Sequence, residues 1–346
     1  MTAQKTLVSH REMTSETINQ AANFSPNHQR SYKGKRIGVV VPAYNEEILI
    51  QRTLETVPDF VSQVVVIDDC SQDNTAAQVQ KFVDADPSRF VLIQHKVNQG
   101  VGGAIASGYM WCRDEEIDVA VVMAGDAQMD PDDMPALLDP VVADEVDYAK
   151  GNRLFTGDAW EQIPRVRYLG NSAMSLLTKI ASGYWHVADS QSGYTAINLA
   201  ALKRINWNQM YKRYGQPNDL LVRLNIYNFR VRDVPIKPVY NIGEKSGIKP
   251  LRMIPKLSWL LWKLFLYRMM QKYVIRDFHP LVFFYGLGLS LLPLGVGLGI
   301  YLLLLRLFIG PVAATSALFA TFLFVSGLQS LFFAMWFDMQ YNQGLR

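Results

Sequence analysis

Residues 64–75 read Val64-Val65-Val66-Ile67-Asp68-Asp69-Cys70-Ser71-Gln72-Asp73-Asn74-Thr75, an apolar run of strand length that ends in polar residues. Similar apolar runs recur along the N-terminal part of the chain, and segments with helical spacing separate them. The other expected strands are Ile37–Val41, Phe90–Ile93 and Val119–Met123, and the expected helices are Glu47–Val57, Asn74–Val83 and Gly102–Arg113. This alternation predicts an α/β fold, with a mostly parallel sheet and helices on both of its faces.

Polar segments directly follow three of these runs, at Pro42–Glu47, Asp68–Thr75 and Gly125–Pro131. Ligands of open α/β sheets bind beyond the carboxyl ends of the strands, so the three segments indicate a binding site at that edge. The glycines of Gly100–Gly103 do not make a dinucleotide-binding motif. Position 105 is Ile105, and the segment follows the third run rather than the first, so a tight turn into a helix is expected instead.

Carboxylates gather in these polar segments. Asp68 and Asp69 end one run, and Asp126 ends another, followed by Gln128 and Asp130. Like charges at adjacent strand ends repel unless a cation or hydrogen-bond donors compensate them. A nucleotide diphosphate with Mg²⁺ or Mn²⁺ would do so, because carboxylate and amide oxygens bind these metals and the metal neutralises phosphate. The alternative for any single Asp is a helix cap or a turn.

Residues 36–250 resemble the family 2 glycosyltransferases of the GT-A fold. Within that family they are most similar to the dolichol- or polyprenyl-phosphate mannose (or glucose) synthases. The matching stretches are Val40–Glu47, Val66–Thr75, Val122–Pro131, Gly151–Arg153 and Asp189–Tyr194. Each stretch is short, and together they are specific. The resemblance implies a domain at 36–250 that binds a nucleotide sugar.

The resemblance also implies roles for individual residues. Those implied to bind the donor nucleotide are Pro42, Tyr44, Glu46, Asp68, Asp69 and Gly125. Asp126 and Gln128 are implied to hold the metal, and Arg153 to contact phosphate. One position departs from the family, whose metal loop reads Asp-x-Asp-x-Gln, because Ala124 stands at the first Asp. Metal binding through the remaining two residues, diphosphate and water is expected; weaker or altered metal affinity, or an inactive homologue, are the alternatives.

The C-terminal part of the chain is strongly apolar. The runs 281–305 and 307–337 carry no charged side chain, and only Arg306 separates them. About 20 apolar residues in a helix cross a bilayer core, so we expect two transmembrane helices within 278–340, at 281–305 and about 311–337. Two buried core helices are the alternative. The glycines of the first run suit close helix packing in lipid, within one chain or in a homo-oligomer.

Residues 251–277 mix aromatic with basic side chains, as in a helix that lies in the membrane interface. The cations are Arg252, Lys256, Lys263, Arg268, Lys272 and Arg276. A solvated helix is one alternative, and a third span is another that the cations make costly. By the positive-inside rule they place the catalytic domain in the cytosol. Two spans return the tail 341–346 to the same side, so both termini are expected there, at the plasma membrane in a bacterium or archaeon.

Residues 1–35 are polar and lack an apolar core, which indicates a poorly ordered tail rather than a signal peptide. The net charge of +3 is too small for a nucleic-acid-binding surface. The two cysteines form no disulfide framework, and the five histidines show no metal-ligand spacing. A membrane-bound enzyme with no nucleic-acid partner is therefore expected.

The architecture indicates the acceptor. Processive polysaccharide synthases carry a Gln-x-x-Arg-Trp signature, which this sequence lacks. A lipid phosphate explains why the site is held at a membrane, and Arg forks suit phosphate. The candidates for binding the acceptor phosphate or sugar are Arg165, Arg167, Asp189, Ser192, Lys245, Ser246 and Lys249. Any one of the cations is alternatively a solvated surface charge. Asp219, which follows Gln216-Pro217-Asn218, is a candidate to orient the acceptor or donor sugar.

A phosphate monoester has a second pKa near 6 and is anionic at neutral pH, so this nucleophile needs positioning more than deprotonation. The expected reaction is direct displacement with inversion at the anomeric carbon of a GDP- or UDP-hexose. Polyprenyl (dolichyl or undecaprenyl) phosphate is the acceptor, and the candidate catalytic residues are Asp126, Arg153 and Asp219. A sugar hydroxyl of a lipid-linked glycan as acceptor, or a catalytically silent membrane scaffold, are the alternatives.

Overall fold

The computed structural model describes residues 30–154, 165–237 and 250–346, and the side chains of 165–171 and 250–253 lie outside this description. A seven-stranded sheet forms the centre of the N-terminal domain, in the order β3-β2-β1-β4-β6-β5-β7. Its strands are β1 (Ile37–Ala43), β2 (Gln63–Asp68), β3 (Phe90–Gln94), β4 (Val119–Val122), β5 (Tyr148–Asn152), β6 (Thr195–Asn198) and β7 (Val231–Pro235). Strand β6 runs antiparallel to β4 and β5, and the other paired strands are parallel. The predicted, mostly parallel sheet is confirmed.

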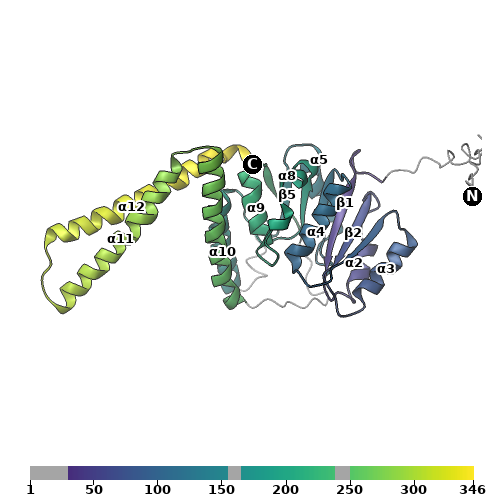
Figure 1. Cartoon of the computed structure of the whole chain (residues 1–346), viewed down its shortest axis with the longest axis horizontal. Helices are drawn as coiled ribbons and strands as arrows, with labels where there is room; N and C mark the ends of the chain where they lie inside the picture. The colour runs from purple at the N-terminus through teal and green to yellow at the C-terminus, as the bar shows by residue number, and fades with distance from the viewer. Residues whose placement is uncertain (1–29, 155–164, 238–249) are drawn as a thin grey trace, which may run out of the picture.

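Helices cover both faces of the sheet (Figure 1). The helices on one face are α2 (Ile50–Glu55), α3 (Thr75–Ala85) and α5 (Met134–Val142), and those on the other are α4 (Val101–Asp114), α8 (Leu199–Arg204) and α9 (Gln216–Ile226). Along β1, Val39 and Val41 enter one core and Val40 enters the other, all fully buried. The first four strands are formed by uninterrupted apolar runs, which is why they could be predicted from the sequence.

Two long helices connect this domain to the C-terminal part of the chain. They are α7 (Arg165–Ser182) and α10 (Pro250–Met270), and α10 continues into the π-helical turn η3 (Gln271–Arg276). Short 3₁₀ turns are η1 (Pro131–Asp133), η2 (Trp207–Gln209) and η4 (Gln343–Leu345). Helix α10 packs against α7 and α9 and stands between the sheet domain and a hairpin of two further helices (Figure 1).

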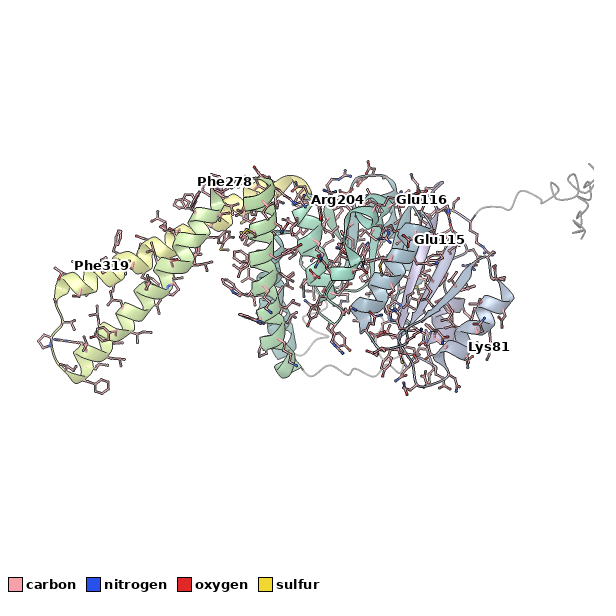
Figure 2. The ribbon with its side chains drawn as sticks, viewed as in Figure 1. Lys81, Glu115, Glu116, Arg204, Phe278 and Phe319 are labelled. Carbon is pink, nitrogen blue, oxygen red and sulfur yellow. The ribbon has the colours of Figure 1, made fainter. Side chains whose placement is uncertain are left out.

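The hairpin consists of α11 (Leu281–Phe308) and α12 (Ala314–Tyr341). Both helices are long and apolar enough to cross a membrane, and only 11% and 17% of their most apolar windows are buried. Core helices of a soluble domain would be mostly buried, so the two are candidate membrane spans. Figure 2 shows Phe278 and Phe319 on this part of the chain, and the charged residues Lys81 and Glu115 on the sheet domain.

Close backbone contact joins the two helices of the hairpin. A Cβ atom on Gly295 would lie 2.5 Å from the Phe324 backbone nitrogen, and one on Gly327 would lie 2.4 Å from that of Leu292. Glycine at these positions therefore lets α11 and α12 approach closely within one chain, as the sequence suggested. Helix α11 continues through Arg306, so it is longer than the predicted span.

The prediction of an interfacial segment at 251–277 needs one correction. Trp259 and Trp262 are 59% and 40% exposed, as expected of an interfacial face. Arg268 and Lys272, however, are 0% and 2% exposed and point into the protein. Their four-residue spacing resembles a solvated basic stripe, but a buried carboxylate and helix-end carbonyls pair with them instead.

The N-terminal boundary of the domain also differs from the prediction. The Tyr32 ring packs on Phe60 with centroids 4.8 Å apart, and its hydroxyl donates to Asp139 Oδ1 at 2.7 Å. Residues from 30 onward therefore belong to the packed domain, and the boundary at 36 lies too far along the chain. Residues 1–29 of the expected tail lie outside the described residues.

Candidate active site

The loops after β1 and β2 are fastened to each other. Asn45 N donates to Ser71 Oγ at 3.0 Å, and Glu46 N donates to Thr75 Oγ1 at 2.9 Å. In return, Asn45 Oδ1 accepts from Gln72 N at 2.8 Å. Polar side chains of each loop thus satisfy the backbone of the other, and the two strand ends form one unit. Glu47 N likewise donates to Asp73 Oδ2 at 3.2 Å, and α2 begins at Ile50 rather than at Glu47 as predicted.

Strained backbone marks the same edge of the sheet. Asn45, Cys70 and Ala127 have φ angles of 56°, 65° and 56°, and they lie in the loops after β1, β2 and β4. This left-handed conformation costs a non-glycine residue roughly 1–2 kcal/mol. It persists where the surrounding structure enforces it, which is common at binding and catalytic sites. The three strained residues therefore coincide with the edge where the sequence predicts the site.

Asp69 is 2% exposed, and donors from its own chain surround its carboxylate. Oδ1 accepts from Gln99 N at 2.8 Å, and Oδ2 accepts from Gly100 N at 2.7 Å. His95 Nδ1 lies 2.7 Å from Oδ1, and its Nε2 lies 2.9 Å from Ser107 Oγ in α4. The carboxylate therefore fixes the loop after β3 against the end of β2.

A groove of about 750 Å³ opens beside this loop. Residues 94–99 line one side, and Lys212 and Arg213 line the other. The two sides meet at α4, where a Cβ atom on Gly102 would lie 2.3 Å from Tyr211 O, and Gly100 has a φ angle of +85°. The predicted tight turn into a helix is confirmed here. Cations on both sides of the groove favour an anionic ligand.

The residues expected to bind the donor nucleotide differ in exposure. Tyr44 is 47% exposed and Glu46 is half-buried, so both can be reached by a ligand. Pro42 and Asp68 are buried, and Asp68 Oδ1 accepts from Ser71 N at 3.2 Å. Together with Asp69 and Gly125, which are also buried, they form the floor beneath the exposed pair.

The loop after β4 carries the expected metal ligands and lies on the β1 loop. Gly125 N donates to Pro42 O at 3.2 Å, and Thr53 Oγ1 donates to Gly125 O at 3.1 Å. Asp126 Oδ1 accepts from Gln128 N at 3.1 Å. Burial, followed by the charges of Asp126 and Asp73, raises the pKa of Glu46 to about 7. The loop thus brings two carboxylates, from Glu46 and Asp126, close enough to repel.

The oxygen atoms of these loops fit a hard divalent cation that would take most of its ligands from diphosphate and water. Glu46, Asp126 and Gln128 offer oxygen atoms of the kind that Mg²⁺ and Mn²⁺ prefer, and a cation would relieve the repulsion that raises the pKa of Glu46. Within the described ranges, no group of three or more His, Cys, Asp or Glu residues is arranged to hold a metal by itself. Ala124 contributes no ligand, so diphosphate oxygens and water would complete the shell.

A second group of residues lies beside this loop, because β6 pairs with β4. Tyr194 OH donates to Asp130 O at 3.0 Å, which places the Asp189–Gly193 segment next to the β4 loop. Arg153, at the end of β5, donates from Nε to Asp189 Oδ2 at 2.8 Å and from Nη2 to Oδ1 at 3.2 Å. Burial alone would raise the pKa of Asp189, but Arg153 outweighs it and lowers the pKa.

Lys150 is a buried cation of this region that the sequence reasoning missed. It lies in the middle of β5, is fully buried, and donates to the Ser192 carbonyl. Burial lowers its pKa to about 8. Ser192, a predicted acceptor contact, is itself 2% exposed. A charged residue in a strand-forming stretch next to Gly151–Arg153 was the available signal, because such a residue is buried only when paired.

The first turn of α9 lies beside this second group of residues. Asn218 Oδ1 accepts from Thr178 Oγ1 at 3.1 Å and lies 3.4 Å from Gln191 Nε2. Asp219 is 2% exposed, and its carboxylate accepts from Arg223 Nε at 2.9 Å and Tyr211 N at 2.7 Å. In this structure Asp219 therefore anchors the backbone beside the groove.

Several expected acceptor contacts are not placed. Lys245, Ser246 and Lys249 lie outside the described residues. Arg165 and Arg167 lie in the first turn of α7, and their side chains are outside the description. The structure does bring together Glu46, Asp126, Gln128, Arg153 and Asp189 at the carboxyl edge of the sheet, through the loops after β1, β4 and β5 and before β6.

The chain was compared with families, characterised proteins and solved structures. The family model for glycosyl transferase family 2 matches residues 38–205. The glucosyl-3-phosphoglycerate synthase of Mycobacterium tuberculosis, solved with Mn²⁺, UDP and phosphoglyceric acid, shares the fold. It is 20% identical, with a TM-score of 0.50 over 75% of this chain and 84% of that one.

Two of the related proteins are named for transfer of a sugar to a lipid phosphate. An undecaprenyl-phosphate mannosyltransferase of Micrococcus luteus is 31% identical, over 61% of this chain and 87% of its own length. A UDP-N-acetylglucosamine–dolichyl-phosphate N-acetylglucosaminyltransferase of Methanococcus voltae is 29% identical, over 60% of this chain and 86% of its own length. The family match, these identities and the GT-A-like sheet agree, and the chain belongs to glycosyltransferase family 2.

Proposed function

We propose that this glycosyltransferase moves a hexose from a GDP- or UDP-sugar to the phosphate of a polyprenyl lipid, dolichyl or undecaprenyl. The observation that carries the proposal is the position of the acceptor side of the site. The helices that support it, α7 and α9, also contact α10, which stands beside the two candidate spans. The two relatives named for transfer to a lipid phosphate support the same acceptor class.

The groove beside the β3 loop is proposed to take the nucleotide. Lys96, Lys212 and Arg213 line it and would neutralise diphosphate charge. Tyr44 and Glu46 face the same edge over the floor formed by Pro42, Asp68, Asp69 and Gly125. Arg153 would orient phosphate through its planar fork, which Asp189 already holds in one rotamer.

Asp126 and Gln128 are the residues proposed to hold Mg²⁺ or Mn²⁺. When bound, such a cation would offset the negative charge of the departing diphosphate. The chain's own contribution is to fix the loop, because Thr53 and Met129 bind the backbone of Gly125 and Ala124. The loop therefore presents its oxygens without reorganising.

We propose direct displacement with inversion: an acceptor phosphate oxygen forms a bond to the anomeric carbon as the bond to the nucleoside diphosphate breaks. The carboxylate that holds Arg153 is not proposed as a general base. Arg153 pairs with Asp189 and lowers its pKa. An ion-paired carboxylate of lowered pKa is a poor proton acceptor at neutral pH, and a phosphate monoester is already anionic.

The proposed arrangement has the catalytic domain and both termini in the cytosol. The exposed Lys256 and Lys263 of α10 and Arg276 of η3 flank the first candidate span, which supports this orientation by the positive-inside rule. In a bacterium or archaeon the membrane would be the plasma membrane. The exposed Trp259 and Trp262 suit the interface.

The proposal is tested with the full chain in vesicles that contain undecaprenyl phosphate. Radiolabelled UDP-N-acetylglucosamine, UDP-glucose and GDP-mannose are supplied in turn, with Mg²⁺ or Mn²⁺. Label in the lipid phase that mild acid releases supports transfer to phosphate, and NMR of the product then gives the anomeric configuration. Acid-stable lipid label would indicate a hydroxyl acceptor. Absence of product with every donor would refute the proposed function.

A further inference from the structure

A buried carboxylate lies near the C-terminal end of α12. Asp338 is 0% exposed, and it accepts from Arg268 Nη1 at 2.8 Å and Nη2 at 2.9 Å. Tyr273 OH donates to it at 2.6 Å, and Trp185 Nε1 donates at 3.2 Å. Burying an ion pair is costly unless further hydrogen bonds satisfy both partners, as they do here. The hydrogen bonds from Arg268, Tyr273 and Trp185 satisfy this buried carboxylate. They indicate that its contact with Arg268 is a specific feature of the fold.

Arg268 also binds the C-terminal end of α7. Its Nε donates to Ala181 O at 2.8 Å, and its Nη2 donates to Ile180 O at 3.0 Å. Cations are favourable at helix C-termini, where carbonyls lack partners. Gly183 follows with a φ angle of +77°, and a Cβ atom there would lie 2.3 Å from Arg268 Nη1. A larger residue at position 183 would therefore collide with the Arg268 guanidinium, and glycine avoids this collision.

Lys272 binds the C-terminal end of α9 in the same way. Its Nζ donates to Asn225 O at 2.9 Å and to Asn342 Oδ1 at 2.7 Å. Asn225 Nδ2 also donates to Asn342 Oδ1, at 2.9 Å. Figure 1 shows the C-terminus of the chain beside α9, in agreement with these contacts. We call Arg268, Lys272, Asp338 and Asn342 the junction.

The opposite end of α9 faces the proposed acceptor side of the site, and α7 meets it near its own C-terminal end, at Thr178. Asn218, in the first turn of α9, accepts from Thr178 of α7 and lies beside Gln191. Gln191 N in turn donates to Asp189 Oδ1 at 3.2 Å. A chain of helix and hydrogen bonds therefore runs from the carboxylate at the end of α12 to the residue that holds Arg153.

We propose that Asp338 is a positioning residue for the lipid acceptor. Through the junction it fixes the α11–α12 hairpin relative to α7 and α9, and so sets the depth at which a membrane-embedded phosphate meets the acceptor side. This inference rests on the proposed function. It implies that the junction matters for an acceptor held in the bilayer and is dispensable for one that diffuses to the site through water.

The test compares two acceptors with the full chain in phosphatidylcholine–phosphatidylglycerol vesicles. One is undecaprenyl phosphate in the bilayer, and the other is water-soluble citronellyl phosphate; UDP-N-acetylglucosamine and GDP-mannose are run in parallel as donors. Asp338→Asn should lower kcat/KM for the bilayer acceptor about tenfold or more, because small misplacement of reacting groups is costly. For the soluble acceptor the change should stay within about threefold, with the donor KM unchanged.

Asp277→Asn is the matched control, because Asp277 is an exposed carboxylate of the same region that accepts from Tyr341 of α12 at 2.7 Å. It should leave both acceptors within about twofold, as expected of an exposed contact. Equal losses for both acceptors with Asp338→Asn, or no loss, would overturn the inference while leaving the proposed function intact. A wild-type protein that uses neither acceptor would refute the proposed function, and the inference with it.

A second variant separates positioning from folding. Asp338→Asn leaves Arg268 buried without its counter-ion, which can destabilise the chain. Arg268→Met with Asp338→Leu removes both charges, and such replacements are often tolerated. If this double variant binds nucleotide normally yet still loses the bilayer acceptor selectively, positioning is supported. If it recovers wild-type transfer to undecaprenyl phosphate, the junction serves stability alone and the inference is wrong.

Discussion

Asp69→Asn tests how the nucleotide side of the site is built. The carboxylate accepts two backbone N–H groups through different oxygens, Gln99 N on Oδ1 and Gly100 N on Oδ2. An amide has one oxygen, so one of these buried N–H groups must face an NH₂ group. The loss of a charge-assisted bond and the unsatisfied donor together cost about 3 kcal/mol. For a domain of about 200 residues, the size of the sheet domain, that corresponds to a fall of roughly 6–12 °C in Tm.

The measurement is thermal unfolding in detergent without nucleotide, followed by intrinsic fluorescence, together with UDP and GDP titrations. Asp59→Asn is the control, because the Asp59 side chain is fully exposed and its Oδ1 lies 3.6 Å from Arg89 Nη1. It should change the free energy of unfolding by less than about 1 kcal/mol. Both Tm and nucleotide affinity should fall for Asp69→Asn. Loss of affinity with an unchanged Tm would refute the reasoning, because it would make Asp69 a ligand contact instead.

Three further outcomes follow from the structure. Asp126→Asn should lower transfer by about a hundredfold and remove the response to added Mn²⁺, measured by initial rates; an unchanged metal response would exclude Asp126 as a ligand. Gly183→Ala should lower the free energy of unfolding by about 2 kcal/mol, from the positive φ and the clash with Arg268, whereas Gly286→Ala, with no atom within 4 Å, should change it little. Burial raises the pKa of Asp233 to about 6, so the folded state holds an extra proton and stability falls as pH rises from about 4 to 6. Asp233→Asn should flatten Tm across that window, and an identical pH profile would contradict the assignment.

The strands that the sequence predicted are those formed by uninterrupted apolar runs. Runs such as Val64–Ile67 contain no polar residue, so length and composition identify them. Strand β5 escaped prediction because Lys150 stands in its middle, and β7 because Arg232 and Asp233 do. Their charges are accommodated by partners distant in sequence, such as the Ser192 carbonyl for Lys150, and no local pattern encodes those partners.

The burial of Arg268 and Lys272 in the segment 251–277 could not be predicted for the same reason, because their partners are also distant in sequence. Arg268, Lys272 and Arg276 recur at four-residue spacing, but this spacing could not show that the first two would be buried or that a carboxylate from α12 would meet Arg268. Asp338 lies seventy residues further on, in a stretch read as the end of a span. In the candidate site, the polar motifs that follow successive strands predicted which loops would lie together. It did not reveal that the carboxylates of Asp69 and Asp219 accept hydrogen bonds from other residues of the chain.

The two sides of the site are held by different means, and this bears on how the enzyme meets its substrates. On the nucleotide side, short hydrogen bonds between neighbouring loops, such as Asn45 to Ser71, fix the geometry locally. A soluble donor needs nothing more, since it arrives from any direction. The proposed acceptor side instead contacts α7 and α9. Arg268 binds the C-terminal end of α7 and Lys272 binds that of α9, both beside the hairpin. A lipid phosphate, the acceptor that we propose, would arrive only at a fixed depth, so the residues that meet it would need a fixed position relative to the membrane.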